Sequence, residues 1–147
     1  MNISLPDNSP SSADVIADIL KNYKTIAVVG LSSRPTRPSF GVTQYMQSAG
    51  YRIIPVNPNE TEVLGEKSYA RLEDIPPSHH VEIVDIFRRS ENVPPVVDSA
   101  IKIGAKVIWM QQGITNPAAA AKARSAGLVV VEDACILIEH RIRFHSR

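Results

Sequence analysis

Residues 28–41, VVGLSSRPTRPSFG, carry the side chains best suited to hold an anion. Gly30 permits the positive φ or the close ligand approach typical of a phosphate-binding turn. The segment also supplies serine hydroxyls and guanidinium groups that suit phosphate oxygens, and prolines that lower the entropy lost on binding. These residues are Ser32, Ser33, Arg34, Pro35, Arg37 and Pro38. A cap from Ser39 is expected to begin a helix near Phe40, whose N-terminus attracts anions. The alternative is a surface turn that happens to contain arginine.

The same segment departs from the glycine pattern of a dinucleotide-binding loop. Ser32 stands where the second glycine of a G-x-G pair is expected. An NAD site usually carries Asp or Glu at the end of the next strand, and Asn57 takes that place here. A carboxylate would repel a nearby phosphate whereas an amide tolerates one, so Asn57 counts against NAD and is compatible with a phosphorylated ribose. Asn-Pro is also a common turn former, and the sequence leaves both roles open.

Two later segments also end where a crevice is expected. Residues 81–87 end in Phe87, followed by Arg88. Phe87 either walls an adenine or belongs to the core, and Arg88 either contacts phosphate or is solvated. Residues 106–111 end in Gln111, and this residue or Gln112, together with Gly113, is expected at the rim of the crevice.

Catalytic patterns are missing from the sequence. It contains no HxxxH or HxH metal spacing, no G-x-S-x-G elbow and no G-x-x-x-x-G-K-[ST] loop. Cys135 lies in the apolar run ACILI and is interpreted as a packing residue rather than a nucleophile. Asp85 and Asp133 have no evident acid–base partner. We therefore expect a binding protein without a metal or a catalytic group.

Five short apolar runs predict the framework that positions these residues. They are residues 25–30, 51–56, 81–87, 106–111 and 128–133, rich in β-branched residues and with little alternation. Such runs are typical of strands buried on both faces of a parallel sheet, and Trp109 is expected in the core. The segments between them predict crossover helices. The fold class is therefore α/β: a Rossmann-like, doubly wound, mainly parallel five-stranded sheet of order 3-2-1-4-5 with helices on both faces.

Helix boundaries are marked by glycine, proline and capping residues. Gly50, Gly104 and Gly127 are expected to end three helices, and Asn116 is expected to cap the third, with Pro117 at its first position. A first helix over residues 13–23 would be capped by Ser11 or Ser12, and a last helix is expected over residues 133–144. Residues 57–80 predict at most a short helix near 68–74. We expect residues 1–10 to be a flexible tail and residues 11–147 a single domain.

Composition narrows the class of protein further. A net charge of +1 gives no support to a nucleic-acid role, and the single cysteine allows no internal disulfide. No apolar run approaches the roughly 20 residues that span a bilayer. The first residues lack the charged and apolar regions of a secretion signal. The expectation is a cytoplasmic protein.

Residues from about 15 to 144 resemble the CoA-binding domain family, small stand-alone proteins related to the N-terminal domain of the succinyl-CoA synthetase α subunit. The matching stretches run in the same order along most of the chain: IAVVGLSSRPTRPS, GYRIIPVNP, VLGEKSYARLEDIP, VDIFRRSENVPPVVDSAIKIGAKVIWMQQGI and AGLVVVEDACILIEH. The resemblance implies a Rossmann-like fold that holds coenzyme A.

The resemblance also implies where each part of CoA lies. The phosphates are expected on Gly30, Leu31, Ser32, Ser33, Arg34, Arg37, Pro38 and Ser39. The adenosine end is expected near Val56, Asn57 and Pro58, with Ile86, Phe87 and Arg88 lining the same crevice. The pantetheine is expected to run toward Gln111 and Gly113.

The synthetase reaction does not follow from this resemblance. The phosphorylated histidine of that enzyme belongs to a later domain, and these 147 residues contain no counterpart. The leading hypothesis is therefore non-catalytic binding of CoA or an acyl-CoA. The alternatives are an NAD(P)-binding domain of an oxidoreductase type and a regulatory interaction module with a vestigial crevice. A protein partner or a homo-oligomer is compatible with all three.

Overall fold

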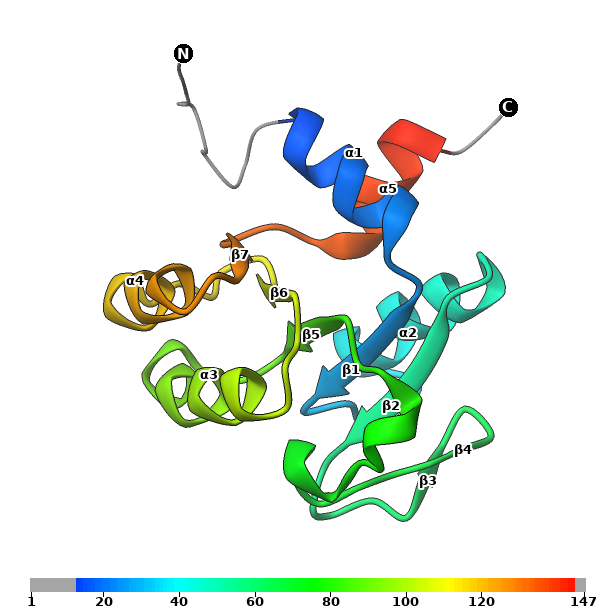
Figure 1. The fold of residues 1–147 in the computed structure, drawn as a ribbon. Coiled ribbons are helices and arrows are strands. Elements are labelled where there is room, and N and C mark those ends of the chain that lie inside the picture. Colours follow the sequence, from blue (N-terminus) through cyan, green and yellow to red (C-terminus); the bar gives the residue numbers. More distant parts are fainter. Residues whose placement is uncertain (1–12, 145–147) are drawn as a thin grey trace.

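The fold is built on a five-stranded sheet in which every neighbouring pair of strands is parallel (Figure 1). The computed structural model describes residues 13–144, so the expected tail and the caps from Ser11 or Ser12 lie outside the described residues. The strands coincide with the five apolar runs: β1 (Thr25–Val29), β2 (Arg52–Val56), β5 (Ile83–Ile86), β6 (Val107–Met110) and β7 (Val129–Val131). Their order is β2-β1-β5-β6-β7. The predicted α/β, Rossmann-like class is confirmed.

The third position of the 3-2-1-4-5 pattern is occupied by an unexpected residue. A single parallel bridge joins Tyr69, which belongs to no named strand, to Val56 at the end of β2. With this rung counted as the third position, the sheet follows the predicted Rossmann-like pattern. Residues 81–87 are the third apolar run along the chain and were expected beside β2. They contain β5, which lies between β1 and β6. A one-residue rung leaves no apolar run, which explains why the sequence did not predict it.

Helices cover the sheet in two layers, one on each face (Figure 1). One face packs against α1 (Ala13–Asn22), α2 (Pro38–Ser48) and α5 (Ile136–Phe144). The other packs against α3 (Val93–Lys102) and α4 (Pro117–Ser125). Trp109 lies in the core between the sheet and α1, α2 and α5, and it is fully buried as predicted. Its indole N–H donates to the Ala134 carbonyl at 2.8 Å. Within residues 13–144, no helix is both long and apolar enough to cross a membrane.

The predicted helix boundaries follow from local chemistry. The Asn116 side chain accepts a hydrogen bond from the Ala119 N–H at 3.0 Å, and Pro117 opens α4, as predicted. Gly127 follows the end of the helix with a φ of +92°. Residues 57–80 hold a hairpin of β3 (Glu62–Val63) and β4 (Glu66–Lys67) that was not predicted. A one-turn 3-10 helix, η1 (Leu72–Asp74), lies where a short helix was expected; η2 (Pro77–His79) and η3 (Ser90–Asn92) are similar turns.

Asp85 is a carboxyl group inside the core. It stands in β5 between Val28 of β1 and Trp109 of β6, and is 2% exposed. Its Oδ1 has no hydrogen-bond partner among the described residues. Burial raises the pKa of the Asp85 carboxyl well above its usual value, because an ionised group is poorly solvated there. The folded protein therefore favours the protonated acid.

This raised pKa predicts a specific dependence of stability on pH. The stability due to protonated Asp85 is fully present below the unfolded pKa of about 3.8 and is lost as the pH rises through the folded pKa. The Asp85→Asn variant cannot ionise at this position. Its free energy of unfolding, minus that of the wild type, should therefore rise with pH by up to about 1.4 kcal/mol per unit. Urea unfolding between pH 5 and 8 measures this difference.

The exposed Asp18 provides the matched control for this prediction. Asp18→Asn should give a curve parallel to that of the wild type over the same pH range. A parallel curve for Asp85→Asn as well would show that Asp85 ionises alike in the folded and unfolded states.

Candidate functional site

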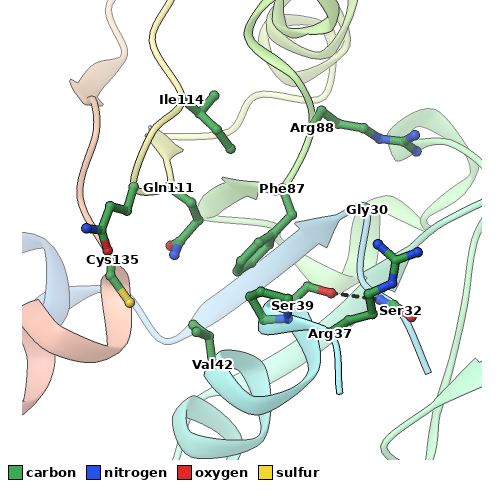
Figure 2. A pocket seen from close by; sticks show the side chains of 12 residues that line it. Gly30, Ser32, Arg37, Ser39, Val42, Phe87, Arg88, Gln111, Ile114 and Cys135 are labelled. Carbon is green, nitrogen blue, oxygen red and sulfur yellow. Dashed lines mark hydrogen bonds between the residues drawn. The ribbon is translucent and has the colours of Figure 1, made fainter. Parts of the chain in front are cut away.

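A cavity of about 520 Å³ opens at the carboxyl edge of the sheet, on the face covered by α2 and α5 (Figure 2). Four segments meet there: the turn after β1, the start of α2, and the segments that follow β5 and β6. The residue before α5 completes the wall. The lining residues are Gly30, Ser32, Arg37, Pro38, Ser39, Val42, Phe87, Arg88, Gln111, Gln112, Ile114 and Cys135. The cavity therefore lies where ligands bind open parallel sheets.

Gly30, directly after β1, lies in close contact with the backbone of Phe87, directly after β5. Gly30 has a φ of +88°, and its N–H donates to the Val56 carbonyl at 2.8 Å. The Phe87 N–H donates to the Val29 carbonyl at 2.9 Å. A Cβ at position 30 would overlap the Phe87 carbonyl oxygen. Glycine is thus required here twice, by its φ and by this contact.

The loop after Gly30 is held by its own hydrogen bonds. The Ser32 N–H donates to Ser39 Oγ at 3.0 Å, and the Arg34 N–H donates to Ser32 Oγ at 3.1 Å. The predicted cap from Ser39 is wrong, because α2 begins at Pro38 with Arg37 at the N-cap and has no side-chain cap. Proline already has a helical φ, which places Ser39 inside the first turn. Ser39 is 5% exposed, and its hydroxyl accepts the hydrogen bond that joins the loop to the helix.

Asn57 braces the loop from the end of β2. Its Nδ2 donates to the Leu31 carbonyl at 3.0 Å, and its Oδ1 accepts from the Asn59 N–H at 2.9 Å. Both ends of the amide are thereby engaged, as in a turn former. Asn57 therefore makes the contacts of a turn former beside the first loop, and its role in binding stays a prediction.

Two guanidinium groups supply the charge of the cavity. Arg37 and Arg88 both line it, and neither takes part in an ion pair within residues 13–144. Among the described residues that line the cavity there is no carboxylate and no histidine. An uncompensated pair of positive charges in a concave site attracts anions.

The far end of the cavity is less charged and is built around the start of α5. Figure 2 shows Cys135 at the end of the cavity opposite Arg37, with its sulfur directed inward. Gln111 is 4% exposed, and its Oε1 accepts from the Ile136 N–H at 3.2 Å, which fixes the start of α5. Val42 and Ile114 add apolar surface. This end suits an uncharged chain with amide groups.

The position of α5 is secured at a second point. The Tyr45 hydroxyl of α2 lies 2.8 Å from His140 Nδ1 of α5. Burial lowers the pKa of the His140 imidazole, and the charge of Lys24 lowers it further. The ring is therefore favoured in its neutral form, which leaves the contact between the two cavity-forming helices uncharged.

A second cavity of about 370 Å³ lies on the other side of the same edge, near α3 and η1. Arg88 lines both cavities, and Val29, which lines the second, directly precedes Gly30 of the first. The remaining lining residues are Val56, Ala70, Arg71, Leu72, Glu73, Asn92, Pro95, Val96 and Ser99. Glu73 accepts a hydrogen bond from the Ser99 hydroxyl at 2.9 Å. The two cavities thus adjoin each other at Arg88 and at the neighbouring residues Val29 and Gly30.

Some of the sequence-predicted residues line one of the two cavities, and the others lie in the core, in the loop or on its surface. Eight line the first cavity, in a set that comprises Gly30, Ser32, Arg37, Pro38, Ser39, Phe87, Arg88 and Gln111. Val56 lines the second. The others line neither: Leu31 and Ile86 are in the core, Asn57 braces the loop, Ser33, Arg34 and Pro58 are on the loop surfaces, and Gly113 donates its N–H to Asp133 Oδ1 at 2.6 Å.

Several lining residues were missed by the sequence interpretation. Val42 and Cys135 have the spacing of core residues, and Ile114 follows a turn. The second cavity is lined by residues 70–73 and one side of α3, and no sequence pattern marks these residues as part of a site. Within residues 13–144 no group of three side chains is arranged to hold a metal ion.

Comparison with known proteins identifies the family. The model of the CoA binding domain, CoA_binding_2, matches residues 24–141. The chain is 44% identical over 134 residues to the uncharacterized protein YneT of Bacillus subtilis strain 168, covering 91% of this chain and 97% of that one. The chain belongs to the CoA-binding domain family.

Solved structures show the same relationship. A hypothetical protein from Pyrococcus horikoshii OT3 superposes with a TM-score of 0.87 at 39% identity, covering 97% of this chain and 98% of that one. The acetyl-coenzyme A synthetase 1 of Ca. Korarchaeum cryptofilum, in complex with phosphate and ADP, gives a TM-score of 0.67 at 28% identity. That match covers 78% of this chain and 26% of the synthetase.

A second ligase shows a similar partial match. The ADP-forming acetate–CoA ligase II of Archaeoglobus fulgidus is 32% identical over 85 residues, which are 56% of this chain and 12% of the ligase. The chain is therefore similar to a small part of each of these enzymes.

The contact at Gly30 predicts the effect of adding one methyl group. Gly30→Ala should lower the free energy of unfolding by about 1–3 kcal/mol more than Gly50→Ala, because of the overlap with the Phe87 carbonyl. Gly50 is the matched control, since its φ is +102° but an added Cβ would meet nothing within 4 Å. Urea unfolding of the two variants measures the difference. Equal losses would show that φ alone accounts for the requirement.

Proposed function

We propose that this protein binds coenzyme A or an acyl-CoA without catalysing a reaction of its own. The observation that carries the proposal is the first cavity, which has two unpaired arginines and no acidic lining residue among those described. Such a lining favours a polyanionic ligand. Membership of the CoA-binding domain family supports coenzyme A as that ligand.

The two cavities suggest how the ligand would lie across the edge. The pyrophosphate would rest on the loop of Ser32 and Ser39, beside Arg37. The adenosine would enter the second cavity near Val56, with Arg88 between the two parts. The pantetheine would follow the first cavity past Phe87 toward Gln111 and Cys135. In this arrangement the pyrophosphate and the pantetheine meet walls of matching polarity in the first cavity.

A non-catalytic role is supported by the chemistry of the lining. General acid–base catalysis needs a titratable group within hydrogen-bond reach of the reacting atoms. The titratable lining groups of the first cavity are Arg37, Arg88 and Cys135, and none of these has a carboxylate or imidazole beside it in the lining. Neither a ligase nor an oxidoreductase reaction is part of the proposal.

Thermal unfolding in the presence of ligands tests the proposal directly. A ligand that binds only the folded state raises the melting temperature by mass action. CoA and acetyl-CoA should raise the melting temperature, whereas NAD and NADP at equal concentration should leave it unchanged. A shift with NAD or NADP alone would indicate a dinucleotide site, and the absence of any shift would contradict a ligand-binding role.

Arg37 provides a residue-level prediction. Arg37→Gln should weaken CoA binding about tenfold or more, because a charge-assisted contact to phosphate contributes roughly 1.5–3 kcal/mol. Isothermal titration calorimetry measures the dissociation constant. Arg52→Gln is the control, since it removes the same charge from an exposed residue at the start of β2, the end away from the cavity. An unchanged dissociation constant for Arg37→Gln would remove Arg37 from the site.

A further inference from the structure

The loop after β1 already holds an anion, which is a side chain of the protein itself. The Oε2 of Glu60 accepts two hydrogen bonds from Ser33, one from its N–H at 2.9 Å and one from its hydroxyl at 3.0 Å. This paired donation from a backbone amide and a hydroxyl is the arrangement that loops use for phosphate oxygens.

Glu60 reaches this loop from the end of β2. The Glu60 N–H donates to the Asn57 carbonyl at 3.2 Å, which closes a turn beside the loop. The side chain of Asn57 also contacts this loop, through its hydrogen bond to the Leu31 carbonyl. Among the described residues Glu60 forms no ion pair, although Arg34 adjoins Ser33 in the chain. The carboxylate is therefore held by neutral donors, as a bound oxyanion would be.

The position of Ser33 separates it from the proposed pyrophosphate site. Ser33 lines neither cavity, whereas Ser32, Arg37 and Ser39 line the first. Ser33 faces Glu60, on the side of β2 and Asn57. The adenosine end of the ligand is proposed to lie near Val56, the last residue of β2. A phosphate at Ser33 would thus be distinct from the pyrophosphate and would belong to the ribose end of the ligand.

We propose that Ser33 is a binding position for a ribose-linked phosphate monoester, and that Glu60 occupies it in the free protein and competes with that phosphate. This inference rests on the proposed binding of CoA. Glu60 then sets selectivity, because a ligand with the monoester must displace the carboxylate or tolerate its charge. A ligand without the monoester leaves Glu60 in place.

Calorimetry with CoA and dephospho-CoA, which lacks only the monoester, tests this competition. The Glu60→Ala variant should bind CoA at least fivefold more tightly than the wild type, and Glu60→Gln should show a smaller gain. Dephospho-CoA should bind the wild type and both variants with the same dissociation constant within twofold. Adding Ser33→Ala to Glu60→Ala should remove most of the gain for CoA.

Glu62→Gln is the matched control for charge. Glu62 is an exposed carboxylate in the same segment with no hydrogen bond to the loop among the described residues, so its neutralisation should leave both dissociation constants unchanged. An equal gain from Glu62→Gln, or equal gains for CoA and dephospho-CoA in Glu60→Ala, would overturn the competition. So would unchanged or weaker binding of CoA by Glu60→Ala, which would make Glu60 a brace of the loop.

The two proposals fail in different ways in this experiment. If the wild type and all variants fail to bind either ligand, the proposed function falls and the inference falls with it. If the wild type binds CoA and Glu60→Ala binds it equally well, only the inference falls. Thermal unfolding of each unliganded variant verifies that the substitutions leave the fold intact.

Discussion

The contact between Gly30 and the Phe87 carbonyl is the constraint on which the edge of the sheet depends. β1 and β5 lie side by side, yet the helices that follow them leave toward opposite faces. The chain must therefore diverge immediately after the two strands, while the strand ends stay in contact. A side chain at position 30 would force them apart. Because only glycine allows this, the two cavities open on either side of one narrow floor.

Recognition at this edge rests on side-chain charge more than on free backbone amides. The N–H groups of Ser32 and Arg34 both donate to serine hydroxyls of the protein, so this part of the loop is braced before a ligand arrives. A braced loop loses little entropy on binding. The guanidinium groups of Arg37 and Arg88 remain without acidic partners among the described residues. They supply the attraction that the loop backbone no longer offers.

Local patterns accounted for most of the fold. The five apolar runs became the five strands, and Asn116 with Pro117 began α4, because these signals depend on neighbours in the chain. Gly30 was identified for the same reason, since a tight turn after a strand requires it.

The misses concern relations between distant segments. Tyr69 completes the sheet through one bridge, which no local pattern marks. Ile86 and Phe87 were assigned to one crevice, but successive residues of a strand point to opposite faces, so Ile86 joined the α3 core. The sequence placed these residues at the carboxyl edge of the sheet, where the first cavity lies, and left the face of each residue undetermined. Cys135 lines the cavity directly before α5, at the point where the Gln111 side chain accepts a hydrogen bond from Ile136.

The rung at Tyr69 also has a consequence for the solubility of the folded chain. An uncovered outer strand offers free N–H and C=O groups to a strand of another molecule, which leads to aggregation. Here the Tyr69 N–H donates to the Pro55 carbonyl at 3.0 Å, and the Tyr69 carbonyl accepts from the Asn57 N–H at 2.8 Å. Pro55 itself has no N–H to offer. The Pro55 carbonyl and the Asn57 N–H are therefore already paired, which closes this end of β2 to further strand pairing.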